Sequence, residues 1–190
     1  MDSSLTLRML EFSAFSDAMD AQKGHDSELA QVLIAASYLD NQLLNILKSF
    51  MIAAGRKLEE KLFEGPMAPM GSFSARTLIA FSLGLIDERE RASIDAIRGV
   101  RNQFAHQITT SFDHKKMTKH FDKLAWVAGQ DRTGNLDRSE LLFLAAIRLG
   151  TSFLNRADHV ALERRVTKVW PSHRIDADPD PDYDPVDAIY

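Results

Sequence analysis

Apolar residues recur at intervals of three and four along most of the chain, which is the spacing of one face of an α-helix. The pattern predicts six helices and one short helical piece, over residues 4–21, 27–53, 57–63, 73–84, 88–105, 114–128 and 137 to about 170. Alternating apolar and polar runs separated by tight turns, which are typical of β-strands, are missing from the sequence. The predicted fold class is therefore all-α, a single helical bundle of about six helices.

Local signals predict where several of these helices begin and end. Four helix starts follow a side chain that accepts a hydrogen bond from the free backbone N–H groups of the first turn. These capping residues are Ser72, Asp87 with Glu90, Asp113, and Asp137 with Glu140. Gly55 is the predicted C-cap of the 27–53 helix, and Pro171 is expected to end the last helix.

The end of the chain differs sharply in composition from the rest. Residues 176–190 hold six Asp and three Pro and no Lys or Arg, so a helix or a buried core is not expected there. The formal charge is −4 for the whole chain, and residues 1–175 alone carry +2. The predicted organisation is an N-terminal helix packed on the core (1–24), a helical domain (25–171) and a disordered acidic tail (172–190).

Composition narrows the cellular setting and the function classes. The chain has no cysteine, which excludes disulfides and thiolate metal sites and favours a cytoplasmic location. No signal peptide and no run of about 20 apolar residues is visible, so no membrane association is expected. The negative charge and the lack of a helix-turn-helix pattern argue against direct DNA binding. No cofactor motif and no metal-ligand cluster is present.

Three charged residues fall on the apolar stripes of three different predicted helices. Asp40, Arg76 and Arg101 each project among aliphatic and aromatic neighbours when the helices are drawn at 100° per residue. An isolated buried charge is too costly to persist, so these residues are expected to form a structural charge network. The network either only braces the core or also orients Arg101 toward a site.

Arg101 opens the run RNQFAH, which ends at His106 and resembles the R-N-x-x-x-H signature of the HEPN superfamily. The order and spacing of four segments resemble the mannitol operon repressor family, which looks like a HEPN-type branch. The segments are AASYLDNQLLNIL (35–47), APMGSFSAR (68–76), FSLGLI (81–86) and IRGVRNQFAH (97–106). The resemblance covers about residues 25–125. It implies a HEPN-like helical domain that forms a homodimer.

Two functions follow from this resemblance. The first is a mannitol-repressor-like regulatory protein that acts through protein–protein contacts with a partner not identified by the sequence. The alternative is a metal-independent HEPN ribonuclease of the toxin or RNA-processing type. In that case the resemblance implies three catalytic residues. His106 would move protons, Arg101 would stabilise the charged phosphorane, and Asn102 would have a positioning role.

A cluster of lysines on the predicted 114–128 helix is the remaining candidate surface. Lys116, Lys119 and Lys123 share one helix face. Such a face is commonly only solvated. The alternatives here are contact with RNA and docking of the acidic tail.

Overall fold

The structure is a computed structural model that describes residues 3–22, 28–53, 55–106, 110–128 and 136–168. Every regular element in these ranges is a helix, which confirms the all-α prediction. In chain order the elements are α1 (Ser3–Asp20), α2 (Glu28–Phe50), α3 (Arg56–Phe63), α4 (Phe73–Ser82), α5 (Glu88–His106), the 3-10 helix η1 (Lys115–Met117), α6 (Thr118–Ala128), α8 (Arg138–Phe153) and α9 (Arg156–Ala161). The predicted acidic tail, 172–190, lies outside the described residues.

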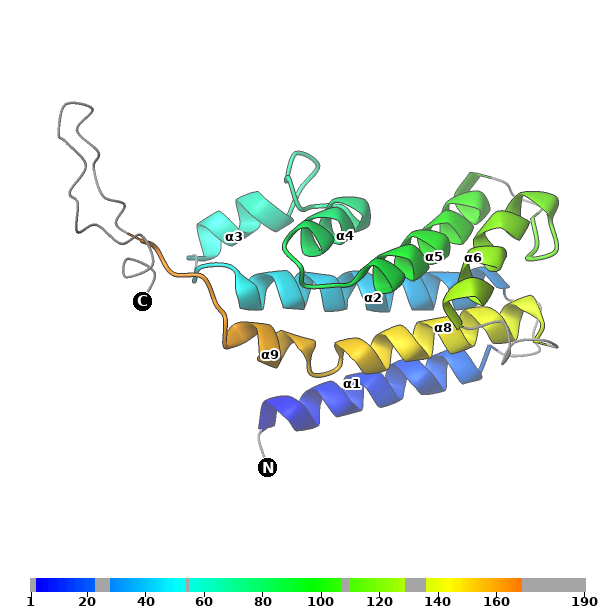
Figure 1. Cartoon of the computed structure of the whole chain (residues 1–190), viewed down its shortest axis with the longest axis horizontal. Helices are drawn as coiled ribbons and strands as arrows, with labels where there is room; N and C mark the ends of the chain where they lie inside the picture. Colours follow the sequence, from blue (N-terminus) through cyan, green and yellow to red (C-terminus); the bar gives the residue numbers. More distant parts are fainter. Residues whose placement is uncertain (1–2, 23–27, 54, 107–109, 129–135, 169–190) are drawn as a thin grey trace, which may run out of the picture.

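Helix α2 is the centre of the bundle and packs against α1, α4, α5, α8 and α9 (Figure 1). A helix enclosed on several sides needs apolar residues over much of its circumference. Its buried residues are Gln31, Val32, Ala35, Ala36, Leu39, Gln42, Leu43, Ile46, Leu47 and Phe50. The periodicity of the predicted 27–53 helix also puts Leu29 and Leu33 on its apolar stripe, but they are 46% and 43% exposed because both lie to one side of the buried face.

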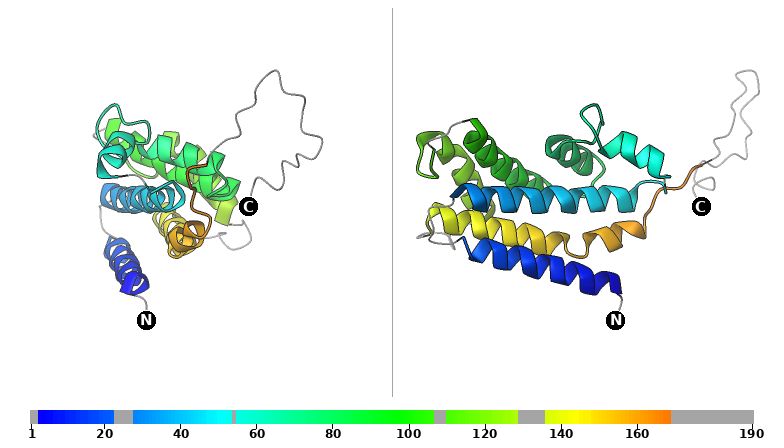
Figure 2. Two further views of the ribbon diagram at one scale, coloured as in Figure 1. Left: turned by 90° about the vertical axis from the view of Figure 1, so that its left-hand side faces the viewer. Right: turned by 180° about the vertical axis from the view of Figure 1, so that it is seen from behind.

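Helices α8 and α1 cover one side of α2. Figure 2 shows α8 running alongside α2 and α1 forming the outermost layer beneath them. Phe15 and Met19 are buried and anchor α1 to this surface. The buried amide of Gln31 donates to Ser139 Oγ at 2.8 Å and to the Gln22 carbonyl at 3.1 Å. One satisfied polar group thus joins α2 to α8 and to the end of α1.

Helices α4 and α5 lie on the opposite side of α2, and α6 packs against both α5 and α8 (Figure 2). The predicted start of α4 is confirmed, because Ser72 Oγ accepts from the Ala75 amide at 3.2 Å. The predicted capping box of α5 is confirmed as well. The Asp87 carboxylate accepts from the Glu90 amide at 2.8 Å, and the Glu90 carboxylate accepts from the Asp87 amide at 2.9 Å. These local bonds set the first turns of both helices.

The last predicted helix is wrong beyond residue 153, because α8 ends at Phe153 and a separate helix, α9, begins at Arg156. Neither proline nor glycine occurs at the break, and Asn155 interrupts the helix with φ −108° and ψ 0°. Arg156 then donates to the Leu85 carbonyl at 2.8 Å and to both carboxylate oxygens of Glu90. Contacts between distant residues, rather than a local stop signal, accompany the change of direction.

Residues 162–168, here called the C-terminal strap, form hydrogen bonds with the C-terminal end of α2. The Arg165 amide donates to the Phe50 carbonyl at 2.8 Å. The Arg164 side chain donates to the Lys48 and Met51 carbonyls at 3.0 and 3.2 Å. The strap therefore satisfies carbonyls that a helix end leaves free. Gly55, predicted as the cap of this helix, is instead the N-cap of α3.

Candidate functional site

The residues of the predicted ribonuclease site lie on the last two turns of α5. Arg101 and His106 are exposed and Asn102 is half-buried. The Arg101 guanidinium donates to the Asn102 side-chain oxygen at 3.4 Å. Arg101 and His106 are five positions apart on one continuous helix, so their side chains leave it in directions about 140° apart. A single chain therefore does not bring them to one reacting atom.

The predicted inward orientation of Arg101 is wrong. The helix wheel placed it on the face of Ile94 and Ile97, and both of these residues are fully buried. A wheel records direction but not position along the axis, and Val100 is the last buried residue of α5. Beyond Val100, α5 keeps only partly buried contact with the core, through Phe104, so Arg101 is no longer enclosed and reaches solvent.

Asp40 and Arg76, the other two members of the predicted charge network, are brought together. Arg76 Nη1 donates to Asp40 Oδ1 at 2.8 Å, and the two side chains are 10% and 28% exposed. Arg76 also donates to the Met70 carbonyl at 2.9 Å and to the Phe63 carbonyl at 3.3 Å. The guanidinium thus joins α2 to both ends of the loop between α3 and α4. This pair is structural and lies apart from the exposed Arg101.

The three lysines of the predicted basic face are all exposed but do not share one regular helix. Lys116 belongs to the 3-10 helix η1, whereas Lys119 and Lys123 lie one turn apart on α6. The predicted cap at Asp113 is wrong, because the His114 ring accepts from the Lys116 amide at 3.2 Å and caps this turn. Lys119 and Lys123 therefore remain as a pair on one face.

His120 occupies a contact between α5 and α6 that the sequence interpretation did not foresee. A Cβ atom on Gly99 would lie 2.1 Å from Cε1 of the His120 ring, so the ring rests where a side chain at position 99 would be. Burial lowers the pKa of His120, as do the positive charges of Lys119 and Lys123. The neutral ring packs against the α5 backbone. A glycine in the interior of a helix, which costs stability, was the available signal for this close approach.

Gly99→Ala is expected to lower the free energy of unfolding by about 1–3 kcal/mol, because the new methyl group overlaps the His120 ring. The same change in a His120→Ala background is expected to stabilise the chain by up to about 1 kcal/mol, since alanine is the better helix former. Urea denaturation followed by circular dichroism measures both. Stabilisation by Gly99→Ala in both backgrounds would show that the ring does not occupy this place.

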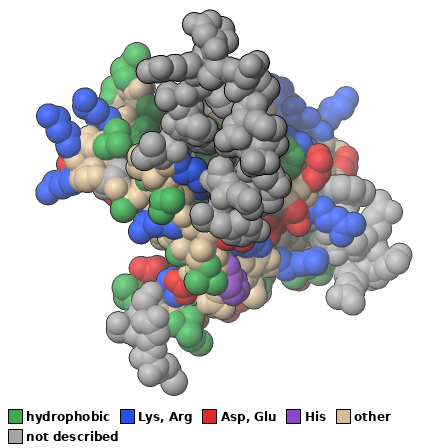
Figure 3. All heavy atoms as spheres, turned by 60° about the vertical axis from the view of Figure 1, so that its left-hand side comes forward, with side chains coloured by type: hydrophobic (Ala, Val, Ile, Leu, Met, Phe, Trp, Pro, Cys, Tyr) green, Lys and Arg blue, Asp and Glu red, His purple; other side chains and the backbone are tan. Residues whose placement is uncertain are grey.

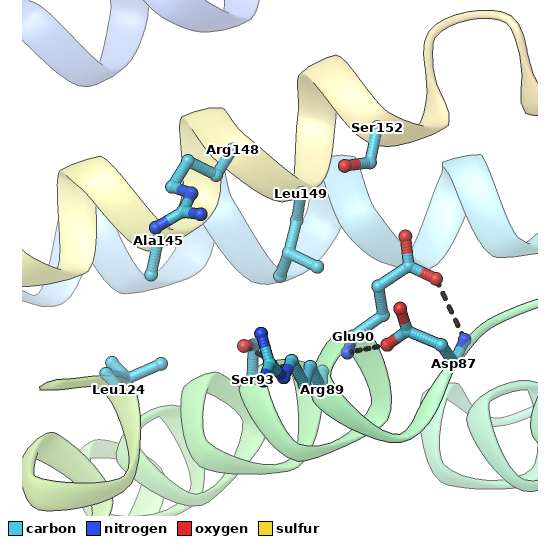
Figure 4. Close-up of a pocket in the computed structure, with 9 residues that line it drawn as sticks. All are labelled: Asp87, Arg89, Glu90, Ser93, Leu124, Ala145, Arg148, Leu149 and Ser152. Atoms are coloured by element: carbon cyan, nitrogen blue, oxygen red, sulfur yellow. Dashed lines mark hydrogen bonds between the residues drawn. The ribbon is translucent and has the colours of Figure 1, made fainter. Parts of the chain in front are cut away.

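A cleft of about 170 Å³ opens between α5 and α8, with α6 at one side (Figure 4). Its lining residues are Asp87, Arg89, Glu90, Ser93, Leu124, Ala145, Arg148, Leu149 and Ser152. Arg89 and Arg148 belong to opposite walls, and Ser93 Oγ donates to the Arg89 carbonyl at 3.0 Å. Its lining carries charges of both signs, Arg89 and Arg148 with Asp87 and Glu90.

The sequence interpretation also missed a half-buried ion pair beside this cleft. Glu90 was identified as a capping residue, and its carboxylate additionally accepts two hydrogen bonds from Arg156, at 2.8 and 3.1 Å. The two side chains are 12% and 27% exposed. The pair fastens the first turn of α5 to the first turn of α9. No sequence signal links two residues so far apart.

The part of the chain that the structure describes contains no group of three or more His, Cys, Asp or Glu residues arranged to hold a metal ion. Within the same residues, no helix is both long and apolar enough to cross a bilayer.

Comparisons with known proteins give one structural likeness. A chain of the "X-ray structure of the MtlR-HPr complex from Escherichia coli" superposes with a TM-score of 0.53 and 16% sequence identity. The match covers 76% of this chain and 98% of the other. No protein-family model and no curated protein matches the sequence. At this identity the likeness concerns the fold alone, and the chain has an MtlR-like fold.

Proposed function

We propose that this protein is a mannitol-repressor-like regulator that acts by docking to a partner protein and has no helix-turn-helix of its own. The observation that carries the proposal is the fold, which is shared over 76% of the chain with a protein solved in a complex with HPr. The side chains of Arg101 and His106 leave α5 in different directions. This supports a binding role for the protein over catalysis by a single chain. The corresponding partner would be an HPr-like protein.

The loop between α3 and α4 is the surface proposed for this docking. Met67 in the loop is 92% exposed, and Leu78 on α4 is 60% exposed. The loop is held by the buried Arg76 guanidinium through the Met70 and Phe63 carbonyls. An apolar side chain on a loop that is already ordered loses little conformational entropy on binding, which favours its use as an anchor.

Isothermal titration of the purified chain with HPr from the same organism tests this proposal. We expect saturable binding, and we expect Met67→Asp with Leu78→Asp to weaken it at least about tenfold, or about 1.4 kcal/mol. Leu7→Asp with Leu10→Asp is the matched control, because these α1 residues are similarly exposed, at 58% and 62%. Absence of binding would refute the proposed partner. A loss of affinity confined to the α1 variant would refute the proposed surface.

A metal-independent ribonuclease is the second candidate, favoured by the exposure of both Arg101 and His106 at one end of α5. In a homodimer the Arg101 of one copy and the His106 of the other would form the site. Light scattering would then give about twice the 21.4 kDa of one chain. Cleavage of single-stranded RNA in EDTA, lost in His106→Ala without a change in melting temperature, would favour this function over the regulator.

A further inference from the structure

The outer surface of α3 carries basic residues around an open hollow. The hollow, of about 410 Å³, is lined by Gly55, Arg56, Lys57, Leu58 and Lys61. Lys57 and Lys61 are exposed and lie one helical turn apart. Arg56 pairs with Glu60 at 2.8 Å, and the ion pairs recorded for the described residues include neither Lys57 nor Lys61. We call Arg56, Lys57, Leu58 and Lys61 the α3 basic surface.

The C-terminal strap brings the end of the described chain to this surface. Arg164 donates to the carbonyls of Lys48 and Met51, only a few residues before α3 begins at Arg56. Figure 3 shows this end of the molecule, with Lys and Arg side chains gathered at the edge where α3 lies. The residues that follow Lys168 therefore start beside a concentration of positive charge.

We propose that the acidic segment 176–187 of this same chain binds the α3 basic surface. The segment holds six aspartates, at positions 176, 178, 180, 182, 184 and 187, with Tyr183 and Val186 among them. Its carboxylates complement Lys57 and Lys61, and its apolar residues complement Leu58, which is 44% exposed. Ion pairs at such an exposed surface are individually weak, so binding requires several of them together.

The place where the described chain ends favours this surface over the lysines of α6. Asp176 follows Lys168 by eight residues, which span at most about 26–29 Å when fully extended. Helix α2, with 23 residues, is about 34 Å long, and the strap and α6 lie toward its opposite ends (Figure 1). Asp176 therefore reaches α3 but falls short of Lys119 and Lys123, whereas Asp187, 19 residues after Lys168, has enough chain to reach either surface. The segment acts as an internal ligand that an acidic partner of α3 must displace.

A single spin label in the tail of the full-length chain tests the proposal, and the absence of native cysteine makes one introduced cysteine unique. With the label on Ala188→Cys, we expect the amide signals of α3 to lose intensity in NMR spectra while those of α6 keep theirs. The loss should disappear in about 1 M salt, where charges are screened over about 3 Å. It should also disappear in Lys57→Glu with Lys61→Glu.

Lys119→Glu with Lys123→Glu is the matched control and should leave the signal loss on α3 unchanged. Three outcomes would overturn the proposal. Loss of intensity on α6 would place the segment on the other lysines, and equal spectra at low and high salt would show no electrostatic docking. Persistence of the effect in the Lys57 and Lys61 double variant would place the segment elsewhere on α3 or beside it. Because HPr is absent from this measurement, the result is independent of the proposed function.

Discussion

Replacing Arg76 by alanine is expected to lower the free energy of unfolding by about 3–5 kcal/mol, because it removes a buried guanidinium from an ion pair and leaves two carbonyls without their donor. The change removes the Asp40 ion pair and both hydrogen bonds to the Met70 and Phe63 carbonyls. It also leaves a cavity where a side chain 10% exposed had packed. Urea denaturation followed by circular dichroism gives the value.

Two further variants separate the contributions of Arg76. Asp40→Asn keeps a side-chain acceptor but removes the charge, so it should cost less than Arg76→Ala. Arg56→Ala removes an arginine whose side chain is 92% exposed and pairs with Glu60 on the same helix. It should cost less than about 0.5 kcal/mol. If Arg76→Ala were no more destabilising than Arg56→Ala, the buried pair would not hold the loop.

Glu90→Ala is the second large effect, with an expected loss of about 2–4 kcal/mol in the free energy of unfolding. The carboxylate caps the Asp87 amide and accepts two hydrogen bonds from Arg156. The loss should be smaller than that of Arg76→Ala, because Arg156 keeps its bond to the Leu85 carbonyl, whereas loss of Arg76 leaves the Met70 and Phe63 carbonyls without that donor. Thermal and urea denaturation both report it.

The second capping box of the chain provides the control for Glu90. Glu140 accepts from the Asp137 amide at 3.0 Å, in the same arrangement as Glu90 and Asp87, but it is exposed. Glu140→Ala should cost only about 0.5–1 kcal/mol, the ordinary value of a cap. The difference between the two substitutions measures the ion pair with Arg156. Equal losses would contradict a stabilising role for that pair.

Local signals account for the parts of the fold that the sequence predicted well. Ser72, and the two Asp–Glu capping boxes, act within four residues of themselves, so their structural effect can be judged without knowledge of the rest of the chain. The periodicity of α2 likewise identified a central apolar helix. The inward position of Asp40 and Arg76 followed from the same periodicity, because both side chains lie within the length of helix that the bundle encloses.

Long-range contacts account for what the sequence did not predict. At the break between α8 and α9, Arg156 forms hydrogen bonds to Glu90 and Leu85, which lie 66 and 71 positions earlier in the chain. No helix-breaking residue marks the break. The position of Arg101 was predicted wrongly because periodicity contains no information on how completely the core encloses each turn of α5. The contact of the His120 ring with Gly99 depends on how α5 and α6 cross. These features require the packed structure.

The C-terminal strap also constrains the order in which the chain acquires its structure. Lys48 and Arg164, which are joined by a hydrogen bond, are 116 positions apart, so the ribosome makes the central helix long before its cap. Helix α2 is also covered by α9, which is made equally late. Pairings of such high sequence separation form slowly. Until then the apolar face of α2 stays open to other nascent chains, so interrupted synthesis before residue 156 would yield aggregation-prone products.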